Sequence, residues 1–290
     1  MATNKVNKNN IKNKLNFINS YGFEYFDKIY NKTNVKALAP SLKELKGKNN
    51  NFYYPLSINT WDNKEYDAIN RVIASQNFTM GSKVKEFEEK FAKYMNSRYA
   101  VMVNSGSSAN LLMIAALVLD NSIDLNEGDE VIVPTLSWAT TNYPLQQYKL
   151  KSKFIDINLD TLNIDEDAIV SAISKKTKAI FAVNVLGNPC SFKKLNEICK
   201  KYNLILIEDN CESLGAQYNN KHCGSFGITG SFSFYFSHHI HTIEGGMVIT
   251  DNESIYHHLL SLRAHGWIRD LPENNKIYKK KGNRFEDSFV

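Results

Sequence analysis

Three short segments carry side chains whose types and spacing could do chemistry. Ser107 and Ser108 lie where the turn NSGSSANLL runs into an apolar helix, whose free N–H groups could cradle a phosphate or could simply be capped with nothing bound. Asp209 ends the aliphatic run LILIED, where a carboxylate could face a protonated heterocyclic nitrogen, ligate a metal ion or serve as a structural cap. His238 lies in SHHIHTIEGG and could act as a general base at neutral pH or be a solvated turn residue.

Short β-rich runs that alternate with longer helical segments position these side chains. The second helical segment opens after Gly81, with Ser82 as its expected N-cap. This alternation predicts an α/β fold with a mostly parallel sheet and helices on both faces, which binds its ligand at the carboxyl ends of the strands. The predicted strands are 99–104, 130–134, 151–157, 178–185, 203–209, 230–235 and 246–251, and the predicted helices are 63–77, 82–95, 105–119, 137–148, 165–174, 191–202 and 252–265.

Charge and hydropathy exclude several classes of protein. The net charge of +5 is concentrated in residues 1–50, which hold 10 Lys+Arg against 3 Asp+Glu, so the rest of the chain carries −2. No basic patch with interleaved aromatic residues follows, which argues against a nucleic-acid partner. The sequence contains no apolar run of roughly 20 residues and no secretory signal, so we expect a cytoplasmic protein without a membrane partner.

The four cysteines and seven histidines do not form a recognisable metal motif. Cys190, Cys199, Cys211 and Cys223 lack the close C-x-x-C pairs of zinc or redox sites, which indicates ordinary reduced thiols. The cluster H-H-x-H also lacks a compelling ligand spacing. We therefore expect no bound metal.

Taken together, four motifs resemble the DegT/DnrJ/EryC1/StrS aminotransferase family. They are GSSAN, PTLSWATT, EDNCESLGA and SFSFYFSHHIHTIEGGM, which occur in the family's order and at roughly its spacing. The similarity covers about residues 55–290. It implies the aspartate aminotransferase-like fold (fold type I) and a pyridoxal 5'-phosphate or pyridoxamine 5'-phosphate cofactor.

The resemblance also implies roles for individual residues. Trp138 would stack on the pyridine ring, Asp209 would pair with the ring nitrogen, and Glu212 stands where many members carry a glutamine near the ring hydroxyl. Trp138 could instead be a core aromatic residue, and the Ser233 hydroxyl could be satisfied by backbone. The residues that would contact the cofactor phosphate are Ser107, Ser108 and Ser233.

One departure from the family pattern points to a subgroup. In the aminotransferases the pattern resembles S-F-Y-P-x-K, and counting from Ser233 places His238 at the lysine that binds the cofactor covalently. This replacement resembles the sugar 3-dehydratases, in which a histidine is the catalytic base and the C3 hydroxyl of a nucleotide-linked 4-keto-6-deoxyhexose is removed. One branch carries an iron–sulfur cluster on four cysteines, of which only Cys211 has a counterpart here. The chain is more similar to the branch that uses L-glutamate and a GDP-linked sugar, on the route to dideoxysugars such as colitose.

Composition and resemblance together predict the organisation of the chain. The composition of residues 1–50 predicts a Lys/Asn-rich extension. The resemblance predicts that residues 51–290 form the cofactor-binding large domain and that the family's small C-terminal domain is missing. A homodimer is expected. Two alternatives stay open, namely an aminotransferase-like or iron–sulfur relative and a non-catalytic protein that binds pyridoxal phosphate or a sugar nucleotide.

Overall fold

The computed structural model describes residues 57, 59–279 and 288 of a chain that divides into two compact units, Met1–Phe78 and Thr79–Val290. In the first unit, α2 (Asn63–Ser75) opens with a capping box in which the Asp62 side chain and the Glu65 side chain each accept a backbone N–H. The predicted extension 1–50 lies outside the described residues.

The second unit has the predicted alternation of strands and helices. Sequence analysis did not predict the 3₁₀ turn η2 (Val185–Gly187) or the short hairpin of β6 (Gln217–Tyr218) and β7 (Lys221–His222). The other elements are α3 (Ser82–Met95), β1 (Tyr99–Val103), α4 (Gly106–Leu119), β2 (Glu130–Pro134), α5 (Ala139–Gln147), β3 (Lys151–Ile155), α6 (Glu166–Ala172), β4 (Thr177–Val183), α7 (Phe192–Tyr202), β5 (Ile205–Asp209), β8 (Thr229–Ser233), β9 (Gly246–Thr250) and α8 (Glu253–Arg263).

The central sheet has seven strands in the order β1-β9-β8-β5-β4-β2-β3. Four neighbouring pairs are parallel, and only the two pairs that contain β9 are antiparallel. The predicted mostly parallel sheet is therefore confirmed. Its register places Asp209 beside Val183 of β4 and Ser231 of β8, so the end of β5 lies between two neighbouring strand ends.

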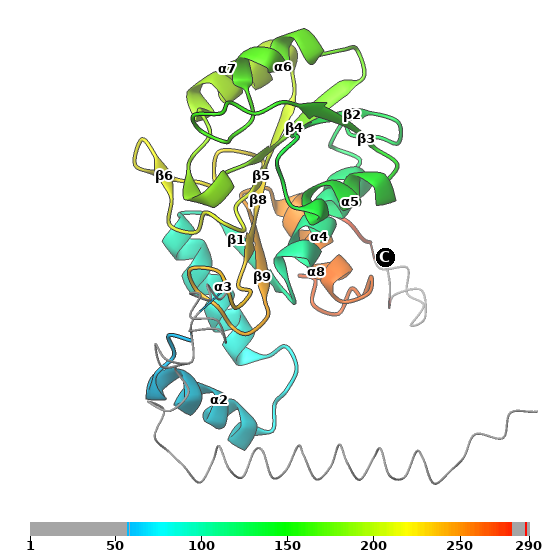
Figure 1. Ribbon diagram of the computed structural model, residues 1–290. Coiled ribbons are helices and arrows are strands. Elements are labelled where there is room, and N and C mark those ends of the chain that lie inside the picture. Colours follow the sequence, from blue (N-terminus) through cyan, green and yellow to red (C-terminus); the bar gives the residue numbers. More distant parts are fainter. Residues whose placement is uncertain (1–56, 58, 280–287, 289–290) are drawn as a thin grey trace, which may run out of the picture. The chain divides into compact units, whose positions relative to one another are not determined.

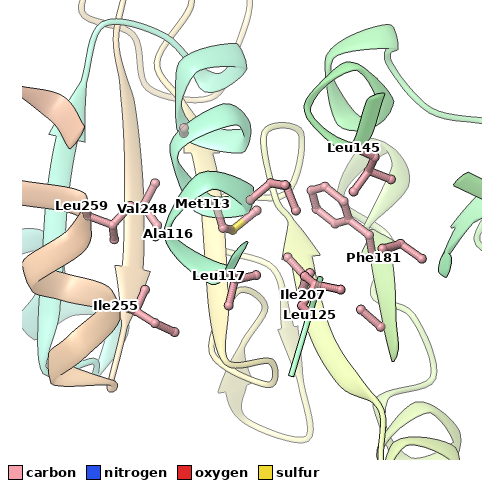
Figure 2. Close-up of a cluster of buried hydrophobic side chains, with 14 of the residues drawn as sticks. Met113, Ala116, Leu117, Leu125, Leu145, Phe181, Ile207, Val248, Ile255 and Leu259 are labelled. Atoms are coloured by element: carbon pink, nitrogen blue, oxygen red, sulfur yellow. The ribbon is translucent and has the colours of Figure 1, made fainter. Parts of the chain in front are cut away.

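Helices cover both faces of the sheet, with α4, α5 and α8 on one face (Figure 1). The sequence of α4, GSSANLLMIAALVL, is apolar on almost every side, as expected for a helix enclosed by other elements. Figure 2 shows Met113 and Leu117 of α4 between the strand residues Ile207 and Val248, with Leu259 of α8 alongside. This packing fixes the start of α4 at the carboxyl edge of the sheet.

The opposite face carries two further clusters. Helices α6 and α7 pack on β2, β4 and β5, and α3 packs on β1, β8 and β9. The centroid of the Phe91 ring lies 5.1 Å from that of Phe232 and 5.6 Å from that of Phe234. The N-cap prediction for α3 was wrong, because Gly81 holds the extended backbone of the cap position and Ser82 is already the first helical residue.

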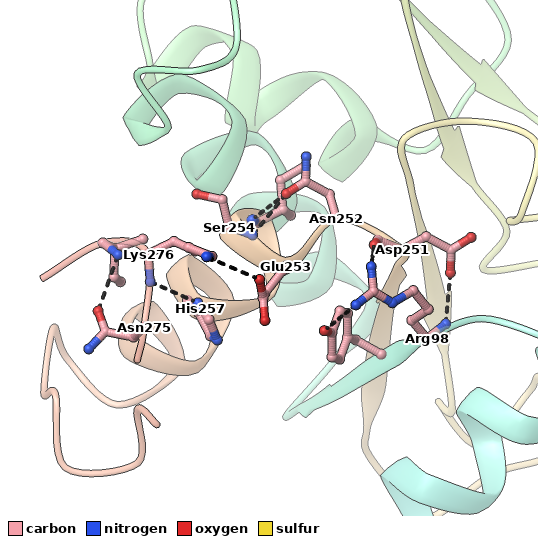
Figure 3. Close-up of polar contacts among 11 residues, drawn as sticks. Arg98, Asp251, Asn252, Glu253, Ser254, His257, Asn275 and Lys276 are labelled. Carbon is pink, nitrogen blue, oxygen red and sulfur yellow. Dashed lines mark hydrogen bonds and ion pairs between the residues drawn. The ribbon is translucent and has the colours of Figure 1, made fainter. Parts of the chain in front are cut away.

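A segment after α8 is attached to that helix through polar contacts (Figure 3). At the start of α8 itself, the Asn252 side chain caps the helix by accepting the N–H groups of Ser254 and Ile255. The backbone N–H of Lys276 donates to Nδ1 of the buried His257 at 3.1 Å. This bond requires His257 to keep Nδ1 unprotonated.

We expect this contact to make stability depend on pH. Burial lowers the pKa of His257 and Lys276 acts the same way, whereas Glu253 raises the pKa. The unfolded chain therefore binds the proton first, so this stabilisation is complete above about pH 6.5 and is lost as the pH falls through the folded pKa. His257→Asn keeps an acceptor but does not titrate. Urea unfolding at pH 7.5 and 5.5 should show wild type losing about 1 kcal/mol relative to this variant, and an equal loss in both proteins would contradict the assignment.

Candidate functional site

The loops that follow five parallel strands meet at the carboxyl edge of the sheet. Strands β1 and β8 both run antiparallel to β9 and therefore parallel to each other. The predicted site residues lie at the ends of β5 and β8 or follow β1, β2, β5 and β8, while η2 follows β4. The topology thus brings together segments that are more than 100 residues apart in sequence.

The start of α4 forms a small, tightly packed turn beside the end of β8. Ser105 is the N-cap, and its Oγ accepts the Ser108 N–H at 3.1 Å. An ideal Cβ placed on Gly106 would lie 2.5 Å from Cβ of Ser233 and 2.7 Å from Sγ of Cys211. Ser107 is exposed and Ser108 is partly buried. The structure therefore groups Ser107, Ser108 and Ser233 around a helix start whose first N–H groups have no partner within the helix.

Gly106→Ala tests this close approach. The added methyl group would overlap Ser233 and Cys211, so β8 or α4 must move, and we expect a loss of about 1–3 kcal/mol in the free energy of unfolding. Ser107→Ala, one residue along the same helix turn but exposed, is the matched control and should change the free energy by less than about 0.5 kcal/mol. Equal urea unfolding curves for the two variants would show that the turn can relax without cost.

Asp209 is a buried carboxylate whose two oxygens have different surroundings. Its side chain is only 4% exposed. Oδ2 accepts two side-chain donors at 2.8 Å each, Nδ2 of Asn110 from α4 and Oγ1 of Thr141 from α5. Oδ1 accepts the Cys211 N–H at 3.1 Å. Three donors therefore fix the carboxylate, and the two side-chain donors, from α4 and α5, both bind Oδ2.

Sequence reasoning missed Asn110, Thr141 and Ser231. Ser231 Oγ lies 2.6 Å from Oδ1 of Asn110, and all three side chains are buried. A signal was present for Asn110, because an amide within the apolar helix sequence GSSANLLMIAALVL must find polar partners when buried. Ser231 and Ser233 are two residues apart in β8 and so project from the same face of the strand.

Glu208, next to Asp209, has a structural role. Neighbouring residues of a strand point to opposite faces, and Glu208 lies fully buried away from the candidate site. Its oxygens accept the N–H groups of Gly224, Phe226 and Gly227, each at 2.6 Å. Burial raises the pKa of Glu208 to about 7, against the opposing effect of these three donors. Glu208 anchors the loop that leads into β8.

Glu212 and His238 follow β5 and β8 and are close enough for the charge of Glu212 to act on His238. Oε2 of Glu212 accepts the N–H of Leu186 at 3.0 Å, and Leu186 holds a left-handed backbone with φ 52° that is unfavourable for a branched residue. His238 is half-buried, and its backbone N–H donates to the Tyr235 carbonyl at 2.9 Å. Burial lowers the pKa of His238, while the charge of Glu212 raises it. Because the pKa is lowered, the His238 imidazole is neutral at neutral pH and can accept a proton.

Trp138 is the residue predicted to stack on the pyridine ring. It is the N-cap residue of α5, the helix that carries Thr141, and its side chain is 74% exposed. The alternative that Trp138 is a core aromatic residue is therefore wrong. Its open ring is available to a planar ligand.

The cysteines and histidines offer no cluster of metal ligands in the part of the chain that the structure describes. All four cysteines are free thiols, and burial raises the pKa of Cys199 and of Cys223 to about 12. Within residues 57, 59–279 and 288, no group of three or more His, Cys, Asp or Glu side chains could hold a metal ion. Over the same residues, no helix is both long enough and apolar enough to span a bilayer.

A seven-stranded sheet with one antiparallel strand, helices on both faces and a buried aspartate at the end of β5 defines an aminotransferase-like α/β protein. Residues 59–285 match the DegT/DnrJ/EryC1/StrS aminotransferase family, and the chain belongs to that family. The predicted fold class and family are thereby confirmed.

Individual relatives show which members of the family the chain is similar to. The chain is 55% identical over 237 residues to GDP-4-keto-6-deoxy-D-mannose 3-dehydratase of Escherichia coli O55:H7, a match that covers 81% of this chain and 61% of the relative. It is similar to a solved structure of GDP-4-keto-6-deoxymannose 3-dehydratase with a trapped PLP-glutamate geminal diamine, with TM-score 0.79, 54% identity and coverage of 82% and 62%. A histidine-to-asparagine variant with bound GDP-perosamine gives TM-score 0.78, 55% identity and the same coverage. The chain thus spans about three fifths of these relatives' length.

Proposed function

We propose that this chain forms the cofactor-binding part of a sugar 3-dehydratase. The enzyme removes the C3 hydroxyl of a nucleotide-linked 4-keto-6-deoxyhexose, with GDP-4-keto-6-deoxymannose favoured, and takes its amino group and electrons from L-glutamate. The observation that carries the proposal is His238, a half-buried imidazole after β8 at the position where the aminotransferase pattern has lysine. An imidazole moves protons but cannot attach the cofactor covalently.

The residues at the strand ends fit pyridoxal or pyridoxamine phosphate. The N-terminus of α4, with Ser107, Ser108 and the adjoining Ser233, suits the phosphate group. Asp209, whose Oδ1 accepts the Cys211 N–H, would pair with the ring nitrogen, and the exposed ring of Trp138 would suit stacking on the cofactor ring. Glu212 is the candidate for contact with the ring hydroxyl. When bound, the cofactor supplies an amino group for condensation with the sugar ketone and a ring that withdraws electrons.

The protein's own side chains then have separate tasks. Asp209 keeps a proton on the ring nitrogen, because its carboxylate is held in place by Asn110 and Thr141. A ring nitrogen of His238 accepts the proton that leaves carbon, and the imidazolium then returns a proton to the departing C3 hydroxyl. The Glu212 charge favours that imidazolium.

The remaining assignments concern organisation. We propose that residues 51–290 act as the large domain, in the cytoplasm, and that a second copy packs against the carboxyl edge of the sheet. Large apolar side chains are exposed in the loops after three of the strands, which supports a partner there. They are Leu136, Trp138, Leu186, Ile240 and Ile243.

Product analysis distinguishes this function from its alternatives. The purified chain is incubated with pyridoxal phosphate, L-glutamate and GDP-4-keto-6-deoxymannose. The nucleotide sugars are then separated, and their masses are measured by mass spectrometry. The proposal predicts a product lighter by one oxygen atom, together with 2-oxoglutarate and ammonia. A product with an amine at C4 would indicate an aminotransferase, and unchanged sugar with bound cofactor would indicate a binding protein.

A further inference from the structure

We infer that Asn110 is a positioning residue that fixes the orientation of the Asp209 carboxylate toward the cofactor ring. The inference rests on the proposed function, because it concerns how this chain would hold pyridoxal or pyridoxamine phosphate. It assigns a role to a buried hydrogen-bonded chain, Ser231–Asn110–Asp209, that joins β8, α4 and β5.

The orientation of the Asn110 amide follows from its neighbours. Nδ2 lies 2.8 Å from Oδ2 of Asp209 and 3.3 Å from the Thr140 carbonyl oxygen. Both neighbours accept hydrogen bonds and cannot donate them, so the NH₂ group must face them. The amide oxygen therefore faces Ser231, whose hydroxyl donates to it at 2.6 Å.

This arrangement leaves the two oxygens of Asp209 unequal. Oδ2 receives the Asn110 amide and the Thr141 hydroxyl, whereas Oδ1 receives the Cys211 N–H. Two donors on one oxygen prevent the carboxylate from rotating, and Oδ1 keeps a lone pair for a ring N–H. Asn110 and Ser231 are 1% and 0% exposed, so water cannot replace them readily.

The same chain fixes a distance between two parts of the site. Asn110 lies one turn into α4, whose first turn is the candidate phosphate cradle, and it binds Asp209, the candidate partner of the ring nitrogen. Ser231 lies opposite Asp209 in the β5–β8 register. The phosphate cradle and the carboxylate are thereby held by one buried amide at a fixed separation.

A double-mutant cycle on cofactor binding tests the role. The dissociation constant of pyridoxamine phosphate is measured by its fluorescence for wild type, Asn110→Ala, Asp209→Ala and the double variant. Asn110→Ala should weaken binding about 10-fold in the wild-type background, since it removes a hydrogen bond to a charged group, and by less than about 2-fold when Asp209 is already alanine. Equal effects in both backgrounds would overturn the inference while leaving the proposed function intact.

A spectroscopic readout separates positioning from a loss of stability. The pH at which the bound cofactor ring loses its nitrogen proton should fall in Asn110→Ala and in the milder Ser231→Ala, because Asp209 no longer holds that proton firmly. Thr229→Val is the matched control, since it removes another buried hydroxyl of β8, one that donates to the Ile249 carbonyl. An unshifted titration in Asn110→Ala and Ser231→Ala would contradict the role. A wild-type chain that fails to bind pyridoxamine phosphate would overturn the proposed function and this inference together.

Discussion

Replacing His238 by asparagine is expected to reduce formation of the 3-deoxy product by about 10²–10⁴-fold, the usual contribution of a general acid–base residue. The amide has a similar shape but cannot take up a proton. The dissociation constant of pyridoxamine phosphate should change little, because the proposed cofactor contacts are made by other side chains, namely Ser107, Ser108, Trp138, Asp209, Glu212 and Ser233. Rates of product formation and fluorescence binding curves measure the two effects separately.

His239→Asn is the control for this prediction. The neighbouring imidazole is exposed, whereas His238 is half-buried beside the Glu212 and Asp209 charges. A comparable loss of rate in both variants would count against His238 as the base. In wild type the rate should also fall as the pH drops through the pKa of His238, which burial places below the ordinary value of about 6.5.

Asp209→Asn should weaken pyridoxamine phosphate binding by about 10- to 100-fold, equivalent to roughly 1.5–3 kcal/mol for a hydrogen bond to a charged group. The loss of rate should be larger still, since an uncharged amide does not keep a proton on the ring nitrogen. The introduced NH₂ group would also face an existing donor in either orientation, because Asn110 and Thr141 donate to Oδ2 and the Cys211 N–H donates to Oδ1.

The control for Asp209→Asn is Asp160→Asn, the same chemical change at an exposed loop position. Fluorescence binding curves and product assays at one pH compare the two variants. An Asp209→Asn protein with wild-type affinity and wild-type rate would remove Asp209 from the proposed site.

Much of the fold could be predicted because short apolar runs indicate strands and longer ones indicate helices. The run EVIVP and the helix GSSANLLMIAALVL each identify one element, and their alternation implies parallel pairing. The two-residue strands β6 and β7 were missed, since a pair this short has too few residues to show a period. The N-cap of α3 was misplaced by one residue because glycine and serine both suit that position.

The candidate site was predictable in its strand-end members but not in the residues behind them. Asp209 stands at the strand end that the pattern predicts, whereas Ser233 and His238 were indicated by the family resemblance. The predicted strand 230–235 runs two residues past Ser233, where β8 ends. The link from Asn110 to Asp209 joins residues 99 positions apart, and only the strand order brings them within hydrogen-bonding distance. The anchoring of Glu212 by Leu186 depends on a left-handed turn that no sequence pattern for leucine predicts.

The most direct test of the account is an NMR spectrum of the nucleotide sugar formed in D₂O by wild type and by His238→Asn in the presence of pyridoxal phosphate and L-glutamate. The account predicts that wild type converts the C3 carbon from CHOH to a methylene that carries solvent deuterium, with the C4 ketone retained, and that the variant does so at least about 10²-fold more slowly. A wild-type product that keeps its C3 hydroxyl and carries an amine at C4 would contradict it.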